Sequence, residues 1–135
     1  MVAHIFASVF LIAVPVAVIA NEHGTDGFKL NIPDEIEWQD GPLSLPKGAQ
    51  IAVLEGDPAK EGPFVFRVKV PDGYRIPVHT HPKTERVTVI AGTFHIGMGD
   101  KFDKDSAKPM KAGTYGYWKA GMKHFVWTEG ETTVQ

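Results

Sequence analysis

Two histidines separated by one residue, with a glutamate close behind them, form the most informative chemical pattern in the 135-residue chain. On an extended strand, His79 and His81 project their imidazoles from the same face. Glu85 follows four residues after His81, beyond a turn opened by Pro82, and so short a turn lets it fold back beside both rings. Neutral imidazoles and a carboxylate are suitable ligands for a divalent transition metal. The spacing therefore predicts a metal site around these three residues.

The carboxylate of Glu85 needs a partner if it faces the core. Residues 85–91 alternate and are rich in β-branched side chains, which predicts a strand on which Glu85, Val87, Val89 and Ala91 share the inward face. An ionised carboxylate is too costly to bury alone among such neighbours. We therefore expect it to be paired or ligated.

A fourth ligand is expected from another histidine. His95 lies between Phe94 and Ile96, so it faces away from the core if those two fill it, and we expect it to have a structural or surface role. His124 follows a turn and shares its parity with Val126. This makes His124 the better candidate.

Short strands separated by turns are the elements that must position these residues. Eight segments from residue 50 onward have apolar or alternating patterns: 50–56, 63–70, 76–81, 85–91, 93–99, 113–118, 123–129 and 131–135. Such a series indicates an all-β sandwich or closed barrel. Residues 100–111 interrupt it and are interpreted as a charged surface loop. No helix of consequence is expected after residue 20.

Composition limits the classes of function. The length suits one domain with a real core. The formal net charge of -2 supplies no basic field to hold a phosphate backbone, so nucleic acid is not an expected partner. The chain has no cysteine, which excludes disulfides, thiolate metal ligands and a cysteine nucleophile. It also lacks a phosphate-binding glycine loop and a dinucleotide fingerprint.

The first twenty residues form an apolar leader without formally charged side chains. Two interpretations compete: a secretory signal peptide cleaved after Ala20, and an uncleaved membrane anchor of about 19 residues. The polar residues that follow favour cleavage, so we expect an exported protein, periplasmic or extracellular. Its expected parts are the leader at 1–20, an arm and connector at 21–49, and a β-domain at 50–135.

The histidine region resembles the first sequence motif of the cupins. That motif reads G, five residues, H-x-H, three or four residues, E, six residues, G. Every position is filled here, by Gly73, His79, His81, Glu85 and Gly92.

The second cupin motif is matched in part. Gly113, Gly121 and His124 stand at its positions, whereas Lys119 replaces its proline and Thr128 its asparagine. These departures affect the turn and the final cap rather than the ligand. The resemblance covers about residues 50–135.

The resemblance implies a small jelly-roll β-barrel with one divalent metal in its mouth. The implied ligands are His79, His81, Glu85 and His124. Manganese, iron, nickel, copper, cobalt and zinc all accept this ligand set. The resemblance also makes a homodimer plausible, through edge strands or the N-terminal arms.

Two classes of function stay open. As an enzyme, the protein would use open metal positions to bind a small oxygen-bearing substrate, dioxygen or both. The resemblance makes oxygenase chemistry the commonest expectation, ahead of isomerase and lyase chemistry. As a non-catalytic exported module, it would instead bind metal or a small ligand without turnover. A storage role is a weaker third alternative, because the chain is too short for the two-barrel form.

Side chains that could line a pocket occur on several predicted strands. The candidates are Phe64, Phe66, Val87, Met98, Tyr115, Tyr117 and Trp127. Tyr115 and Tyr117 are weak catalytic candidates, since a phenol near a metal could donate a proton.

Overall fold

The computed structural model describes residues 27–135. The predicted leader and its cleavage position at Ala20 lie outside the described residues. Asn31–Gln135 form one compact unit. No helix within residues 27–135 has the length and apolar character needed to cross a membrane.

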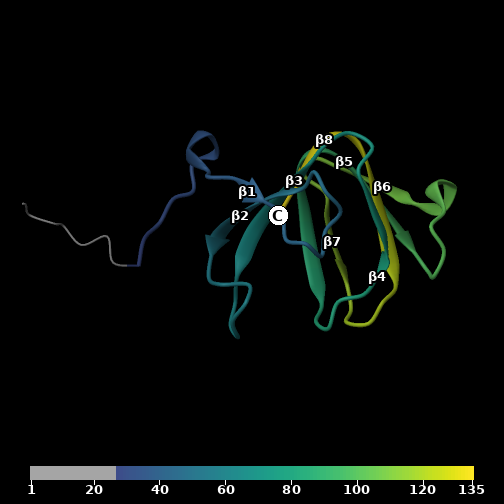
Figure 1. The fold of residues 1–135 in the computed structure, drawn as a ribbon, viewed down its shortest axis with the longest axis horizontal. Coiled ribbons are helices and arrows are strands. Elements are labelled where there is room, and N and C mark those ends of the chain that lie inside the picture. The colour runs from purple at the N-terminus through teal and green to yellow at the C-terminus, as the bar shows by residue number, and fades with distance from the viewer. Residues whose placement is uncertain (1–26) are drawn as a thin grey trace, which may run out of the picture. The chain divides into compact units, whose positions relative to one another are not determined.

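The compact unit consists of antiparallel strands and two short 3-10 turns. The strands are β1 (Gln39–Asp40), β2 (Gln50–Glu55), β3 (Val65–Val70), β4 (Arg75–His79), β5 (Glu85–Met98), β6 (Lys108–Lys111), β7 (Tyr115–Trp118) and β8 (His124–Val134). The turns are η1 (Pro33–Glu35) and η2 (Lys104–Ser106). The strand order is β1-β2-β3-β8-β5-β6, with β4 paired to β8 and β7 paired to β5. The strands wrap into a barrel, with β1 and β2 on one side of it (Figure 1). The predicted all-β cupin-type barrel is confirmed.

The two longest strands, β5 and β8, each change pairing partners along their length. The start of β5 pairs with β7 and its later part with β6, while β8 pairs with β4 at its start and β3 at its end. The sequence predicts four shorter strands here, and the structure joins them in pairs. Gly92 makes one bend possible, because its φ is 75° and a Cβ would collide with the Glu131 carbonyl and Thr132.

The inner face follows the predicted alternation only as far as Val89. Val87 and Val89 are buried, but Ala91 is exposed, so its predicted inward position is wrong. The pairing with β8 shifts register on both sides of Ala91, and these irregularities turn its side chain outward. The buried core cluster comprises Val87, Val89, Phe94, Ile96, Met110, Trp118 and Val126.

The interpretation of residues 100–111 as one surface loop is wrong at its end. Lys108–Lys111 form β6, which pairs with β5 and buries Met110. Pro109 is tolerated because β6 ends the strand order, where a missing N–H disturbs no inner pairing. The ring of Phe102, in the preceding loop, packs against Phe125 at a centroid distance of 4.8 Å.

Part of the predicted arm and connector belongs to the compact unit. Strand β1 pairs with β2, and Ala49 is buried with Val70 and Tyr74 in a second apolar cluster. The Tyr74 hydroxyl donates a hydrogen bond to the Pro46 carbonyl. These contacts attach residues 39–49 to the barrel.

Candidate functional site

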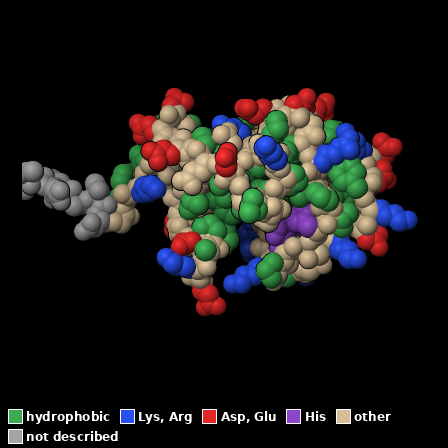
Figure 2. Space-filling view, in the orientation of Figure 1, with side chains coloured by type: hydrophobic (Ala, Val, Ile, Leu, Met, Phe, Trp, Pro, Cys, Tyr) green, Lys and Arg blue, Asp and Glu red, His purple; other side chains and the backbone are tan. Residues whose placement is uncertain are grey.

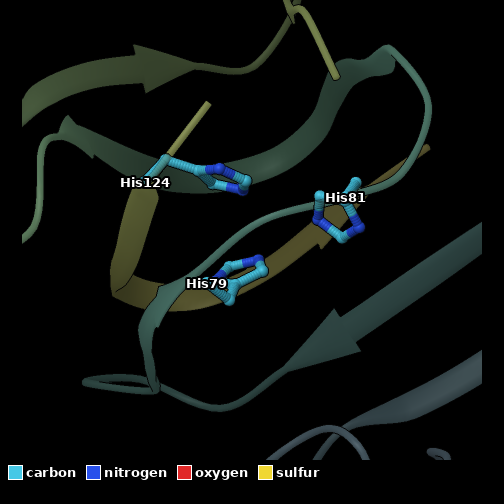
Figure 3. A group of neighbouring side chains, drawn as sticks. All are labelled: His79, His81 and His124. Carbon is cyan, nitrogen blue, oxygen red and sulfur yellow. The ribbon is translucent and has the colours of Figure 1, made fainter. Parts of the chain in front are cut away.

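Four residues from separate elements meet at one end of the barrel. His79 is the last residue of β4, His124 is the first residue of β8, and the two are register partners. His81 lies in the loop after β4, and Glu85 begins β5. Three of these side chains, the imidazoles, point toward a common space (Figure 3).

The three imidazoles lie close enough to share one ligand. Ring centroids are 4.2 Å apart for His79 and His124, 4.9 Å for His79 and His81, and 5.2 Å for His81 and His124. One nitrogen from each ring lies within 4.8 Å of the others. These three residues could therefore hold a metal ion together.

Backbone carbonyls orient two of the rings. His79 Nδ1 lies 2.8 Å from the Pro77 carbonyl oxygen, and His124 Nδ1 lies 3.0 Å from that of Met122. A carbonyl only accepts, so each Nδ1 carries the proton in the neutral ring and each Nε2 keeps its lone pair. Metal-binding histidines are commonly oriented in this way.

One oxygen of Glu85 joins the group. Glu85 Oε2 lies 2.9 Å from His81 Nε2 and 3.3 Å from His124 Nε2. Two ligand atoms on one ion, each about 2.1 Å from it, lie roughly 3.0 to 3.4 Å apart when neighbouring. The Trp118 indole N–H also donates to Oε2, at 2.6 Å. The carboxylate is thus held beside the imidazoles.

The local electrostatics keep Glu85 ionised. Burial by itself raises the pKa of Glu85, but the contacts with His124, His81 and Trp118 outweigh it and hold the pKa below its ordinary value. Burial lowers the pKa of His79, against the opposing hydrogen bond to Pro77. Burial also disfavours the charge on His124, but the contacts with Glu85 and Met122 raise its pKa above the ordinary value.

The donor set fits a divalent metal. His81 Nε2 is buried but makes no hydrogen bond, because its approach to Glu85 lacks hydrogen-bond geometry. A buried nitrogen without a partner is costly, and a metal ion would satisfy it. Three imidazole nitrogens and one carboxylate oxygen are the ligand types that transition metals accept.

The two tyrosine candidates from the sequence lie away from the imidazoles. Tyr115 and Tyr117 are exposed, on the face of β7 opposite buried Trp118, so the structure does not support their proposed proton-donor role. Met98 is also exposed, but it is the register partner of His124 and therefore lies beside the site.

His95 has a structural role, as one of the two alternatives from the sequence, structural or surface, proposed. It is buried, stacks on Trp127 at a centroid distance of 3.7 Å and approaches Glu129 at 3.3 Å. Both rings therefore belong to the outer side of the sheet rather than to the site.

Sequence reasoning missed Trp118 as a site residue. Its alternation with Tyr115 and Tyr117 was visible, but its contact depends on the pairing of β7 with β5, which places it opposite Glu85. The signal that could have identified Trp118 is Glu85, a carboxylate that the sequence predicts to be buried and therefore to need a partner.

Comparison with known proteins gives one family match. The profile of the ChrR cupin-like domain matches residues 29–134. No match was found among curated proteins.

Several solved structures share the fold. KdgF from Halomonas sp. is 18% identical with a TM-score of 0.60, over 79% of this chain and 88% of its own. A predicted oxalate decarboxylase from Thermotoga maritima is 19% identical with a TM-score of 0.61, over 78% and 94%. A chain of the complex of Rhodobacter sphaeroides SigE with the anti-sigma ChrR is 19% identical with a TM-score of 0.54, over 76% and 49%. At these identities the likeness concerns the fold alone.

Proposed function

The chain belongs to the ChrR cupin-like domain family, and we propose that it binds one divalent transition metal through His79, His81, Glu85 and His124. Its assignment to the cupins from sequence motifs is confirmed. The observation that carries the metal proposal is the convergence of three imidazoles, two of them in contact with the Glu85 carboxylate, with His81 Nε2 buried and lacking a hydrogen bond.

Contacts within the chain position these ligands. The carbonyls of Pro77 and Met122 orient two imidazoles, and the Trp118 indole holds the Glu85 carboxylate. The side chain of His124 is 1% exposed and that of His81 is 39% exposed. We therefore place the approach of a small ligand on the His81 side, where the ring is exposed although its Nε2 atom is buried.

We infer that the protein is an enzyme acting on a small oxygen-bearing molecule, with oxygenase-type chemistry. When bound, the metal supplies Lewis acidity or electron transfer at the positions that the four side chains leave open. Access on the His81 side supports this proposal, because a purely structural site is usually closed by protein ligands.

A non-catalytic metal-binding or ligand-binding module is the second candidate. The positions of Tyr115 and Tyr117 favour it, because both face away from the imidazoles and leave the enzyme without the proton donor suggested by sequence. A panel of oxygen-bearing substrates separates the two candidates. Turnover that disappears on demetallation supports the enzyme, and binding without turnover supports the module.

Elemental mass spectrometry of untagged protein tests the metal site. We expect about one metal per chain in the native protein and loss of most of it in His81→Ala. Ile90→Ala, an exposed position on β5, is the matched control and should keep its metal. Equal metal content in all three proteins would refute the ligand assignment.

Export also remains a proposal, based on the apolar leader alone. Mass measurement of protein recovered from its native host tests it. A mature chain that starts near Asn21 supports cleavage, whereas an intact chain in the cytoplasmic fraction contradicts export.

A further inference from the structure

Strand register places two phenylalanines at the same end of the barrel as Glu85. Val68 of β3 pairs with Val134 of β8, and Val134 also pairs with Val89 of β5. Because β3 and β5 are both antiparallel to β8, their first residues lie at the same barrel end. Counting back in steps of two from this row leads to Phe66 on β3 and Phe64 just before it, and to Val87 and Glu85 on β5.

These phenylalanines belong to the inner face of the barrel. Val68 and Val70 pack in the apolar cluster around Tyr74, and residues at intervals of two share a face. Two strand spacings of about 4.8 Å separate Val68 from Val89 across Val134, so β3 and β5 lie about 10 Å apart at this row. This span can accommodate one small ring beside the metal ligands.

The two rings form an apolar wall that no part of the described chain covers fully. Phe64 and Phe66 stack with a centroid distance of 5.7 Å and an interplanar angle of 12°. Phe64 is 43% exposed, and its neighbour Val53, the register partner of Phe66, is 46% exposed. Val70, farther along the same face, is 6% exposed. Burial on this face therefore decreases toward the end that holds Glu85.

Local packing fixes the position of Phe64. Gly56 has a φ of 69°, and a Cβ there would collide with the Pro63 carbonyl and approach the backbone of Phe64 at 3.0 Å. The glycine thus allows the segment before β3 to pack tightly on the end of β2. The space-filling view shows histidine at the surface with hydrophobic side chains around it (Figure 2).

The charged residues of β3 do not contribute to this wall. Arg67 and Lys69 alternate with Phe66 and Val68 and project from the opposite face, where Arg67 donates to Gln135 and Lys69 lies over Trp38. The inner face of β3 consequently offers ring stacking and apolar contact rather than ion pairing.

We propose that the ligand of the metal site is a small aromatic molecule that carries an oxygen donor. Its ring packs on Phe64 and Phe66, and its oxygen faces the histidines. This inference rests on the proposed metal-binding function and names the substrate class for that site.

Mandelate and lactate provide a matched pair of probes for the aromatic wall. Both carry the same 2-hydroxycarboxylate, but mandelate has a phenyl group where lactate has a methyl group. Isothermal titration of metal-loaded protein should give at least about tenfold tighter binding of mandelate, from the added apolar area. Phe64→Ala should remove most of that preference and leave lactate affinity and metal content unchanged.

The controls separate this inference from the metal proposal. Ile90→Ala shortens an apolar side chain of similar exposure, 42%, and should keep the preference. Phe66→Ala repeats the test at the second ring, with circular dichroism to verify folding. Full metal content with equal affinities for both probes, or a preference that survives both phenylalanine variants, overturns the inference alone. Absence of metal in the native protein overturns the proposed function and this inference with it.

Discussion

Glu85 is the residue on which the site contacts converge. Its Oε2 atom lies within 3.3 Å of His81, His124 and the Trp118 indole nitrogen. Of these, the indole is a donor that cannot ligate a metal, so its function is to hold the carboxylate in place. Such supporting contacts tune a metal site nearly as much as the ligands do.

Removing the indole donor should weaken metal binding. We expect Trp118→Phe to bind metal about 10-fold to 100-fold less tightly, because Glu85 loses its positioning hydrogen bond. A competition titration with a chromophoric chelator, at a temperature where the variant is folded, measures this change.

Trp127 provides the matched control for that experiment. Its indole nitrogen is buried without a hydrogen bond, on the outer side of the sheet beside His95. Trp127→Phe should therefore leave metal affinity unchanged. An equal loss in both variants would mean that general destabilisation, rather than the Glu85 contact, causes the effect.

At the scale of elements, β5 and β8 determine the geometry of the barrel. They pair along most of their length, and between them they carry Glu85 and His124. Gly97 of β5 faces Phe125 of β8 in this ladder, and Phe125 is fully buried at 0% exposure. Their contact leaves no room for a side chain at position 97.

Gly97→Ala should destabilise the protein by about 2 kcal/mol or more, because its Cβ would overlap the buried Phe125 ring. Urea unfolding followed by circular dichroism measures the change. Gly116→Ala is the control: its Cβ would press on the flexible end of Met110, at 3.0 Å, and would meet the Trp118 ring at an ordinary contact distance of 3.6 Å. We expect a loss below about 1 kcal/mol there, and similar losses at both positions would contradict the packing argument.

The contact between Tyr74 and the connector before β2 offers a pH-dependent test. Burial raises the pKa of Tyr74 above its ordinary value. The hydroxyl therefore loses its proton at a higher pH in the folded state than in the unfolded state, where the pKa is about 10. Its contribution to stability is complete below about pH 10 and is lost as the pH rises through the folded-state pKa. Unfolding free energy should therefore decrease above about pH 10.

Tyr74→Phe isolates this contribution. It removes the hydrogen bond to Pro46 and should cost about 1 kcal/mol at pH 8. The variant should also lose part of the decrease above pH 10, whereas Tyr117→Phe, at an exposed position, should behave as the native protein does. An unchanged pH dependence in Tyr74→Phe would mean that Tyr74 does not cause the loss of stability above about pH 10.

For the whole molecule, the proposed metal ligands link separate parts of the barrel. His79, Glu85 and His124 come from β4, β5 and β8, and His81 comes from the loop between the first two. A ligand that binds only the folded state stabilises it according to its concentration and affinity. Metal binding and fold stability should therefore be coupled.

Metal at about 100 times its dissociation constant should stabilise the protein by about 2.7 kcal/mol and raise its Tm. Differential scanning calorimetry with added metal, and then with excess chelator, measures the reversible shift. His81→Ala should respond much less at the same concentration. An equal response in that variant would indicate metal binding elsewhere in the chain.

The sequence by itself determined the fold class and the identity of the clustered residues. Alternation identified most of the strands but not β6, and the two cupin motifs identified His79, His81, Glu85 and His124. Spacing along a strand fixes which side chains share a face, although His81 lies in the loop just after β4. The sequence did not determine that adjacent predicted strands join through Gly92, or that Ala91 turns outward. Those features depend on register between distant strands.

The tertiary structure alone decided which further residues reach the site. Trp118 meets Glu85 only because β7 pairs with β5, and Tyr115 and Tyr117 face outward for the same reason. Phe64 and Phe66 lie at the site end only because β3 and β5 both pair with β8. Local sequence sets parity within one strand, whereas pairing between strands far apart in the chain sets which faces and ends meet.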